Sequence, residues 1–283
     1  LTDVTGVQTC ALPILVLGIV EGVTEYLPVS STGHLILAQR ALGIPPSDAA
    51  DAYAIVIQAG AILAVVQVYS RRISRMAAGV FGRDPEGRGL ALALMAALSP
   101  AVLIAAPLEG LIKHHLFALP PIVAAWALGG LAILIVSAHR RRRGTGPGVG
   151  LPLESLAIKG AVIIGLFQVL AVWPGTSRSL VTILGGLAVG LSLTAAVEFS
   201  FLLGVVMLTG ATVLDAWRHG PTMIEAYGWL PLAVGFVAAA LSAEVAVRWM
   251  LAYIVRHGMA VFGWYRLALA AVVIALMVLG ILG

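Results

Sequence analysis

The sequence predicts an all-α integral membrane protein, a polytopic helical bundle with inverted repeats and two broken, re-entrant helix pairs. Composition is the first observation: 60% of the 283 residues are hydrophobic and 11% are charged, where a soluble domain has about a quarter charged. Long uncharged runs recur along the chain, and they are continuous rather than alternating, which favours helices over a barrel. Finally, two shorter apolar segments are each interrupted by a polar motif.

Six apolar runs are candidates for membrane-spanning helices, because about 20 apolar residues in helical form cross a ~30 Å hydrocarbon core. The four clearest runs are 90–108, 120–138, 229–247 and 260–282, and the two weaker ones are 52–70 and 199–214.

The net charge is +4, and most of the positively charged residues are arginines that lie between the apolar runs. Such clusters in short loops are typical of the cytoplasmic ends of membrane proteins. The charge therefore indicates orientation in a membrane and not binding to nucleic acid, and a contact of the second cluster with lipid headgroups is the alternative. The clusters are Arg71, Arg72, Arg75, Arg83 and Arg88, and then Arg140 to Arg143.

The first residues are treated separately. The stretch "VTGVQTCALPI" (4–14) is similar to a translated sequencing-library adapter. We expect residues 1–14 to be an artefact of that kind and the native protein to begin near Leu15. Cys10, the only cysteine, falls inside this stretch, so no disulfide framework or thiol chemistry is expected.

Two apolar segments are broken in the same way. Residues 15–27 lead into Pro28-Val-Ser-Ser-Thr-Gly33, and residues 160–173 lead into Pro174-Gly-Thr-Ser-Arg-Ser179. Each apolar piece is too short to span a membrane comfortably. Broken segments at corresponding places in two halves are typical of internal repeats with a binding site near the interface of the repeats.

The spacing of other residues supports a repeat. Pro28 and Pro174 lie 146 positions apart, and Asp51 and Glu198 lie 147 apart. The Arg-rich stretch "HRRRRGTGPGVG" is the natural joint between the halves. We therefore predict a first repeat over 15–138, a linker over 139–150 and a second repeat over 151–283.

The side of the membrane on which each loop lies gives an independent argument for an inverted repeat. If both arginine clusters are cytoplasmic, residues 45–51 and 109–119 lie outside. The broken segment 15–44 then enters from outside, and the broken segment 160–195 enters from the cytoplasm. The two polar motifs would meet from opposite faces, as an inverted repeat requires.

Glu21 and Glu25 are the first candidates for chemistry. They are spaced i, i+4, so one helix face carries both carboxylates. An acid at membrane depth is costly and is a functional candidate by default. Two neighbouring carboxylates also repel each other unless a divalent metal, an arginine or a shared proton intervenes. The alternative is an acidic helix end exposed to water.

Three hydroxyls and a histidine follow in the first motif. Ser30, Ser31 and Thr32 precede an apolar helix, where one of them is expected to act as N-cap. The free N–H groups of such a helix start also form a cradle for an anion. His34 lies three residues after Ser31, on the same helix face, where it could serve as acid, base or nucleophile.

Arg178 is the strongest single indication in the second motif. No acid lies within ten residues of it, so its partner comes from elsewhere in the chain or from a ligand. A guanidinium fork suits phosphate, and Thr176 and Ser177 can add donors. The alternative is a salt bridge to Glu21 or Glu25. Together, these groups favour phosphoryl transfer on a substrate with a lipid tail.

The motifs "EGVTEYLPVSSTGHL" (21–35) and "PGTSRS" (174–179) resemble those of the undecaprenyl-diphosphatase family, the bacitracin-resistance membrane phosphatases. The stretches "IQAGAILAVV" (57–66), "GLFQVLAVWPGTSRS" (165–179) and "EFSFLLG" (198–204) are similar too, so that the likeness runs from about Leu15 to the end. The resemblance implies a polytopic fold of inverted repeats with two re-entrant helix pairs. It also implies hydrolysis of undecaprenyl diphosphate to undecaprenyl phosphate and phosphate, which recycles the carrier lipid for bacterial cell-wall synthesis.

The resemblance also implies roles for individual residues. Glu21 and Glu25 would bind Mg²⁺ or Ca²⁺ or act as acid and base, Ser31 would be the nucleophile, and His34 would transfer protons or attack in its place. Arg178 would hold the diphosphate. The further substrate contacts would be Ser30, Thr32, Thr176, Ser177 and Gln168.

The same resemblance places the protein in the bacterial cytoplasmic (inner) membrane, with a site that opens to the periplasmic or outer face and with a homodimer as an expectation.

Two features depart from the family pattern: Leu180 stands where glycine is usual, and "LLGVVMLTGA" (202–211) lacks a proline. A glycine there would allow close backbone approach, so Leu180 could displace the second turn. The main alternative function is a transporter or flippase for a lipid-linked or anionic solute, and another lipid phosphatase is a third.

Overall fold

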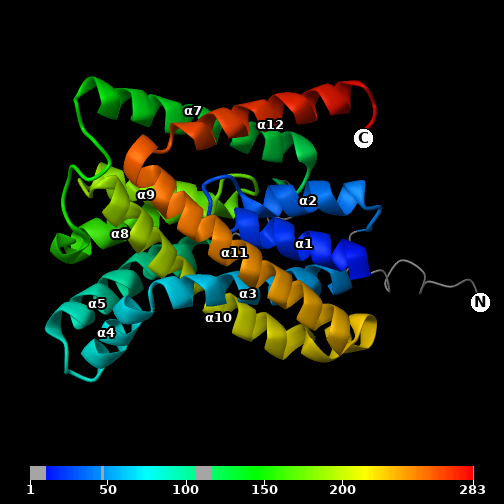
Figure 1. Ribbon diagram of the computed structural model, residues 1–283, viewed down its shortest axis with the longest axis horizontal. Coiled ribbons are helices and arrows are strands. Elements are labelled where there is room, and N and C mark those ends of the chain that lie inside the picture. Colours follow the sequence, from blue (N-terminus) through cyan, green and yellow to red (C-terminus); the bar gives the residue numbers. More distant parts are fainter. Residues whose placement is uncertain (1–10, 46–47, 106, 108–115, 283) are drawn as a thin grey trace, which may run out of the picture. The chain divides into compact units, whose positions relative to one another are not determined.

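The computed structural model describes residues 11–45, 48–105, 107 and 116–282, and within these ranges the chain is helical (Figure 1). The described residues contain no strand; Leu151 and Leu191 form an isolated bridge. The helices are α1 (Ala11–Thr24), α2 (Ser31–Ala41), α3 (Asp48–Val68), α4 (Ser70–Val80), α5 (Pro85–Pro100), η1 (Ala101–Ala105), α7 (Leu119–Arg142), η2 (Leu153–Ser155), α8 (Ile158–Val169), η3 (Leu170–Val172), α9 (Arg178–Ala188), α10 (Leu193–Tyr227), α11 (Trp229–His257) and α12 (Ala260–Val278).

Five helices in the described part are long and apolar enough to cross a membrane. The four clearest predicted spans are confirmed, and so is the weaker run 199–214. The run 52–70 falls largely in α3, of which the described part contains the shorter apolar stretch Val56–Val68. The chain is therefore an all-α, multi-pass membrane protein. The five spans are Pro85–Ile104, Leu119–Arg142, Leu193–Arg218, Trp229–His257 and Ala260–Val278.

The helices form two compact units, and neither is one of the sequence halves. Of the described residues, the first unit comprises those up to 27, then those within 31–70 and 204–249; the second comprises those within 28–30 and 71–203 and those from 250 onwards. Each unit thus takes segments from both halves of the chain.

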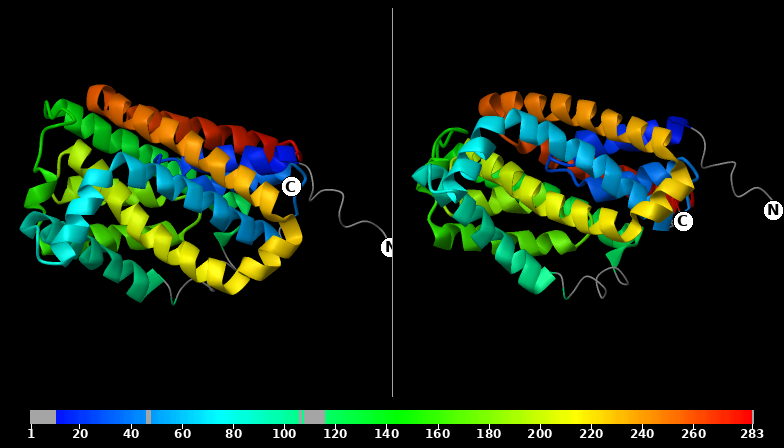
Figure 2. Two further views of the ribbon diagram at one scale, coloured as in Figure 1. Left: turned by 60° about the horizontal axis from the view of Figure 1, so that its bottom comes forward. Right: turned by 90° about the horizontal axis from the view of Figure 1, so that it is seen from below.

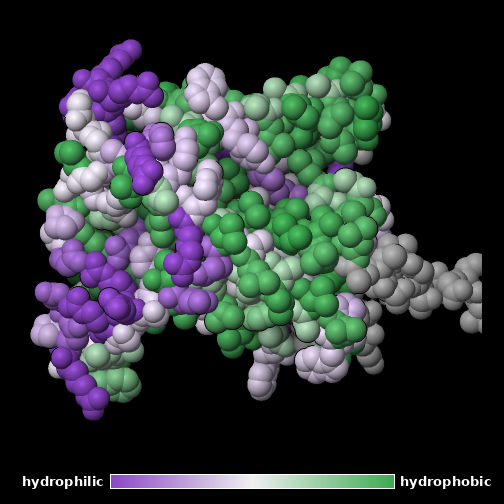
Figure 3. Space-filling view, in the orientation of Figure 1, coloured by the Kyte–Doolittle hydropathy of each residue, from purple (hydrophilic) through white to green (hydrophobic). Residues whose placement is uncertain are grey.

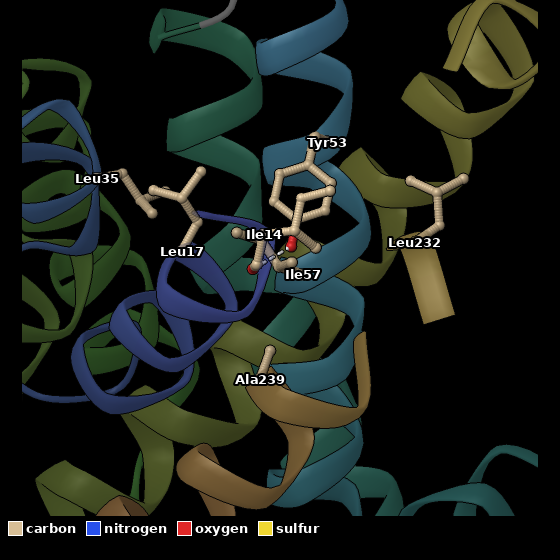
Figure 4. Close-up of a cluster of buried hydrophobic side chains, with 7 residues drawn as sticks. All are labelled: Ile14, Leu17, Leu35, Tyr53, Ile57, Leu232 and Ala239. Carbon is tan, nitrogen blue, oxygen red and sulfur yellow. Dashed lines mark hydrogen bonds between the residues drawn. The ribbon is translucent and has the colours of Figure 1, made fainter. Parts of the chain in front are cut away.

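The first unit positions α1 through a buried apolar cluster (Figure 4). The Tyr53 hydroxyl of α3 donates a 2.6 Å hydrogen bond to the carbonyl oxygen of Ile14 in α1. Gly18 of α1 lies so close to α11 that an added Cβ would be 2.6 Å from the carbonyl oxygen of Gly235. Helix α1 is therefore held from two sides. The cluster consists of Ile14, Leu17, Leu35, Tyr53, Ile57, Leu232 and Ala239.

The second unit is built on paired helices. Helix α12 packs along α7, and α8 packs against both α5 and α9 (Figures 1 and 2). Glycines bring these helices together: a Cβ on Gly165 of α8 would overlap the carbonyl oxygen of Ala97 in α5, and a Cβ on Gly263 of α12 would lie 2.9 Å from the Leu134 side chain of α7. Small residues of this kind allow close helix approach in membranes.

Ion pairs join the polar segments of the second unit. Arg72 donates to Glu154 (2.5 Å) and to Glu198 (2.6 Å), which links α4, η2 and α10. The hydrogen bonds of Glu154 with its own backbone N–H and with Arg72 lower the pKa of that carboxyl. Arg75 pairs with Asp84, the N-cap of α5, and with Glu86. Glu198 thus serves as a partner of Arg72.

The hydrophilic side chains of the second unit gather at one end, over α4, the start of α5 and the end of α7 (Figure 3). This arrangement agrees with the prediction that both arginine clusters share one side. Helix α7 continues through Arg142, so the first residues of the predicted linker 139–150 are helical.

Both predicted breaks are present, and the helices around them repeat. Helices α2 and α9 each have 11 residues, and their first residues, Ser31 and Arg178, lie 147 positions apart. The inverted orientation, the repeat boundaries and the artefact over 1–14 stay predictions. Residues 1–10, and 108–115 of the predicted outer loop, lie outside the described residues.

Candidate active site

Glu21 and Glu25 lie at the end of α1. The helix ends at Thr24, but the Glu25 N–H still donates to the Glu21 carbonyl oxygen at 2.9 Å, so the helical turn continues through both acids. Glu21 is 2% exposed and Glu25 is 8% exposed. This burial is incompatible with the alternative of a water-exposed acidic helix end.

The Ser31 hydroxyl donates to Glu25 Oε2 at 2.5 Å. Ser31 is the first residue of α2, and the turn 25–30 brings it back beside the acid. A short hydrogen bond from a hydroxyl to a carboxylate is a strong, charge-assisted one. The sequence-based prediction paired Ser31 with His34 instead; His34 is half-buried and lies three residues further along α2, while Thr32 is exposed.

Two serines share an unusual backbone conformation. Ser30 and Ser177 both have φ of 75°, the only positive φ among described residues other than glycine. Each is buried, and each directly precedes the first residue of a helix. A non-glycine residue in this region costs of order 1–3 kcal/mol, and such strain is concentrated at functional sites. The two polar motifs therefore use the same local geometry.

Arg178 begins α9 and is anchored in the second unit. Its Nη1 donates to the carbonyl oxygen of Ser200 at 3.3 Å. Ser177 is the N-cap of α9, and its hydroxyl accepts from the Leu180 N–H at 3.3 Å. Leu180 is buried in the regular first turn of α9, so the helix accommodates the leucine that departs from the family pattern.

A network of buried hydroxyls lies behind Arg178. The hydroxyls of Ser177 and Ser179 are 3.0 Å apart, and those of Thr182 and Ser200 are 2.6 Å apart. Thr182 also donates to the carbonyl oxygen of Arg178. Sequence reasoning missed Ser179, Thr182 and Ser200; the available signal was in "SRSLVT", where Ser179 and Thr182 are three residues apart and so share one helix face.

Gln168 of α8 is 1% exposed, and neither side-chain amide atom has a hydrogen-bond partner among the described residues. Burial of an amide without partners is costly, so such a group normally binds water, an ion or a ligand. Gln168 was predicted as a substrate contact, and this environment suits that role. Thr176, the other predicted contact in this unit, is half-buried.

The predicted residues divide between the two units. The structure brings Ser31 to Glu25 in the first unit, and in the second it bonds the Arg178 side chain to the Ser200 carbonyl oxygen and the Arg178 carbonyl oxygen to the Thr182 hydroxyl. The first unit carries Glu21, Glu25, Ser31, Thr32 and His34, and the second carries Ser30, Gln168, Thr176, Ser177 and Arg178.

The donor set suits a hard divalent cation. Within the described ranges, no three His, Cys, Asp or Glu side chains come together as a metal cluster. Glu21 and Glu25 nevertheless offer two buried carboxylates on adjacent turns. Mg²⁺ is commonly bound by one or two carboxylates together with substrate phosphates, so the residues present fit such an ion.

Comparison with known proteins shows which family the chain resembles. The family described as bacitracin resistance protein BacA matches residues 14–272. A protein of Sorangium cellulosum named undecaprenyl-diphosphatase is 44% identical over 262 residues, which cover 92% of this chain and 84% of that protein. The undecaprenyl-diphosphatase 2 of Rhodospirillum rubrum is 45% identical over 260 residues, 92% of each chain. An undecaprenyl-diphosphatase of Cereibacter sphaeroides is 40% identical over 274 residues, 96% of this chain and 99% of its own length.

The family match extends over nearly the whole chain and includes both polar motifs. It confirms the resemblance that the motifs indicated. The chain therefore belongs to the bacitracin resistance protein BacA family.

Proposed function

We propose that this protein is an undecaprenyl-diphosphatase. It hydrolyses undecaprenyl diphosphate to undecaprenyl phosphate and inorganic phosphate, recycles the carrier lipid for cell-wall synthesis and confers resistance to bacitracin. The similarity to proteins named undecaprenyl-diphosphatase supports this function. The structural observation that carries it is the hydrogen bond from the Ser31 hydroxyl to the buried carboxylate of Glu25.

A hydroxyl bonded to a carboxylate is an activated nucleophile. In our proposal, Ser31 Oγ attacks the terminal phosphorus, and Glu25 accepts the hydroxyl proton. The bond between that phosphorus and the bridging oxygen breaks, so undecaprenyl phosphate leaves and a phosphoserine forms. Water then attacks the phosphoserine, which releases phosphate and restores the hydroxyl. His34 transfers protons during these steps.

The second motif binds the diphosphate. The planar guanidinium of Arg178 matches two phosphate oxygens at once. Helices α2 and α9 begin at Ser31 and Arg178, and the N-terminus of a helix favours anions. Gln168 brings an amide whose donors and acceptor have no partner among the described residues. Ser30, Thr32, Thr176 and Ser177 complete the substrate contacts.

Glu21 and Glu25 would hold a divalent cation, Mg²⁺ or Ca²⁺. When bound, the ion would neutralise part of the negative charge of the diphosphate. The protein itself contributes the two buried carboxylates, and the turn between α1 and α2 brings the Ser31 hydroxyl to that of Glu25.

The membrane spans support a cellular setting for this activity. The chain crosses a membrane several times, as expected for an enzyme whose substrate carries a lipid tail. We place it in the bacterial cytoplasmic membrane, with the site opening to the periplasmic or outer face and with a homodimer as its assembly. The exposed apolar side chains of the spans provide the surface for lipid.

A transporter or flippase is the second candidate, because broken helices also occur in transporters. The hydrogen bond from the Ser31 hydroxyl to Glu25 favours hydrolysis, since transport needs no activated nucleophile. The test is phosphate release from undecaprenyl diphosphate by the purified protein in detergent, with His34→Ala and Arg178→Ala beside it. Release that both substitutions abolish supports the phosphatase, whereas a folded protein that releases no phosphate would indicate transport.

A further inference from the structure

Arg266 is a buried charge to which the phosphatase chemistry assigns no role. It lies in α12, and its side chain is 0% exposed. A cation within a membrane span is costly, so such residues are functional candidates by default and bind acids or backbone carbonyls inside the bundle. None of the described acids forms an ion pair with Arg266.

The guanidinium binds four backbone carbonyls. Its Nε donates to Trp126 (3.3 Å) and its Nη2 to Ala125 (2.8 Å), both in α7. Nη2 also donates to the carbonyl oxygen of Gly175 at 2.8 Å, and Nη1 donates to that of Pro28 at 3.2 Å. One side chain therefore connects α7 with the turns of both polar motifs.

The sequence makes room for this side chain with glycines. A Cβ on Gly129 of α7 would lie 2.8 Å from Cζ of Arg266, inside van der Waals contact. A Cβ on the next residue, Gly130, would lie 2.9 Å from the carbonyl oxygen of Gly263 in α12. The absence of side chains at these positions lets α12 approach α7 and lets the guanidinium reach the α7 carbonyls.

The two turn carbonyls occupy equivalent positions. Pro28 lies three residues before Ser31, where α2 begins, and Gly175 lies three residues before Arg178, where α9 begins. The two carbonyls are thus 147 positions apart, the same offset that relates α2 to α9. Arg266 binds the same point of both turns.

We propose that Arg266 is a positioning residue that fixes the turn 28–30 relative to the turn at Gly175 by binding their equivalent carbonyls. The catalytic consequence rests on the proposed phosphatase function, in which Ser31 follows the first turn and Arg178 follows the second. Displacement of reacting groups by about 1 Å can reduce a rate about 100-fold. An anchor shared by both turns therefore controls the rate without contact with the substrate.

The test compares three variants of the full-length protein in detergent. Arg266→Met keeps an unbranched apolar stem but removes all donors, Arg266→Lys keeps the charge with fewer donors, and Gly129→Ala keeps the arginine but displaces its guanidinium. We measure kcat for phosphate release and amide hydrogen exchange of the peptides that contain the two turns. We expect kcat to fall about 100-fold in Arg266→Met and exchange in both turns to accelerate about tenfold or more. Arg266→Lys and Gly129→Ala should fall between this variant and the wild type.

Two control variants separate positioning from general stability. Ile133→Ala removes a buried side chain of α7 that takes no part in the carbonyl contacts, and it should lower Tm while both turns stay protected. Gly210→Ala adds a methyl group to α10 where nothing lies within 4 Å, and it should behave as the wild type.

The outcomes decide the proposal in each case. Turn exchange in the Arg266 and Gly129 variants that equals that of Ile133→Ala would overturn it, as would full activity in both Arg266 variants. If Arg266→Met does not fold, Gly129→Ala and Arg266→Lys decide by the same measurements. If the wild type releases no phosphate, the proposed function fails, and the exchange data alone still establish or refute the anchor.

Discussion

Glu25→Gln separates a catalytic base from an acid that only orients Ser31. The substitution keeps the shape of the side chain and an oxygen that can accept from the Ser31 hydroxyl, but it removes the negative charge. A hydrogen bond to a charged group contributes ~1.5–3 kcal/mol and one to a neutral group ~0.5–1.5 kcal/mol. Weakening this bond alone therefore costs ~1 kcal/mol, which is about fivefold in rate. Loss of a general base costs about 10²–10⁴-fold.

The assay is phosphate release from undecaprenyl diphosphate under saturating substrate and saturating Mg²⁺ or Ca²⁺, so that a weaker metal site in the variant does not lower the rate. We expect Glu25→Gln to lose at least about 100-fold in kcat. The matched control is Glu86→Gln, because the Glu86 side chain is 66% exposed in its pair with Arg75, and it should match the wild type. A Glu25→Gln enzyme that keeps about a fifth of the wild-type rate would refute the role as base and leave only orientation of Ser31.

Three further predictions concern substrate binding and stability. Arg178→Lys keeps a charge but loses the planar fork, so KM should rise about tenfold, the equivalent of one lost hydrogen bond; an unchanged KM would exclude Arg178 from diphosphate binding. Tyr53→Phe removes the hydrogen bond to the Ile14 carbonyl and should lower the free energy of unfolding by ~1 kcal/mol with activity intact; an unchanged melting curve would contradict this. Folding lowers the pKa of Glu154 below its unfolded value of 4.5, so the charged Glu154 stabilises the fold above that pH, and this stabilisation is lost as pH falls through the folded pKa. The Tm of Glu154→Gln should therefore fall less on acidification than the Tm of the wild type. Identical curves of Tm against pH for the two proteins would contradict this prediction.

The sequence predicted the features that local chemistry determines. Uninterrupted apolar runs predicted the spans, because length and hydropathy alone decide whether a helix can cross the membrane. Pro28 and Pro174 predicted the breaks, since proline removes a donor and disfavours helical geometry in the residue before it. The i, i+4 spacing of Glu21 and Glu25 predicted that both acids share one helix face. In the structure the helical turn continues through both residues, and both side chains are buried.

Contacts between distant segments could not be predicted in this way. The pairing of Ser31 with Glu25 depends on the path of the turn between them, and helical spacing favoured His34 instead. Arg266 donates to backbone carbonyls as many as 238 positions away in the sequence. Every residue has a backbone carbonyl, so the residue types at those positions do not indicate the contact. The sequence contains the glycines at 129 and 130, but only the packing of α12 against α7 shows that they make room for the Arg266 guanidinium.

The most direct test of the phosphatase account is phosphate release by the wild type and by Ser31→Ala, each with Mg²⁺ or Ca²⁺ and with EDTA. The account predicts release from undecaprenyl diphosphate that depends on the divalent ion and is absent in Ser31→Ala, while both proteins show the same melting temperature within the effect of one lost hydrogen bond. Wild-type activity in Ser31→Ala would contradict the assignment of the Ser31 hydroxyl, bound to Glu25, as the nucleophile.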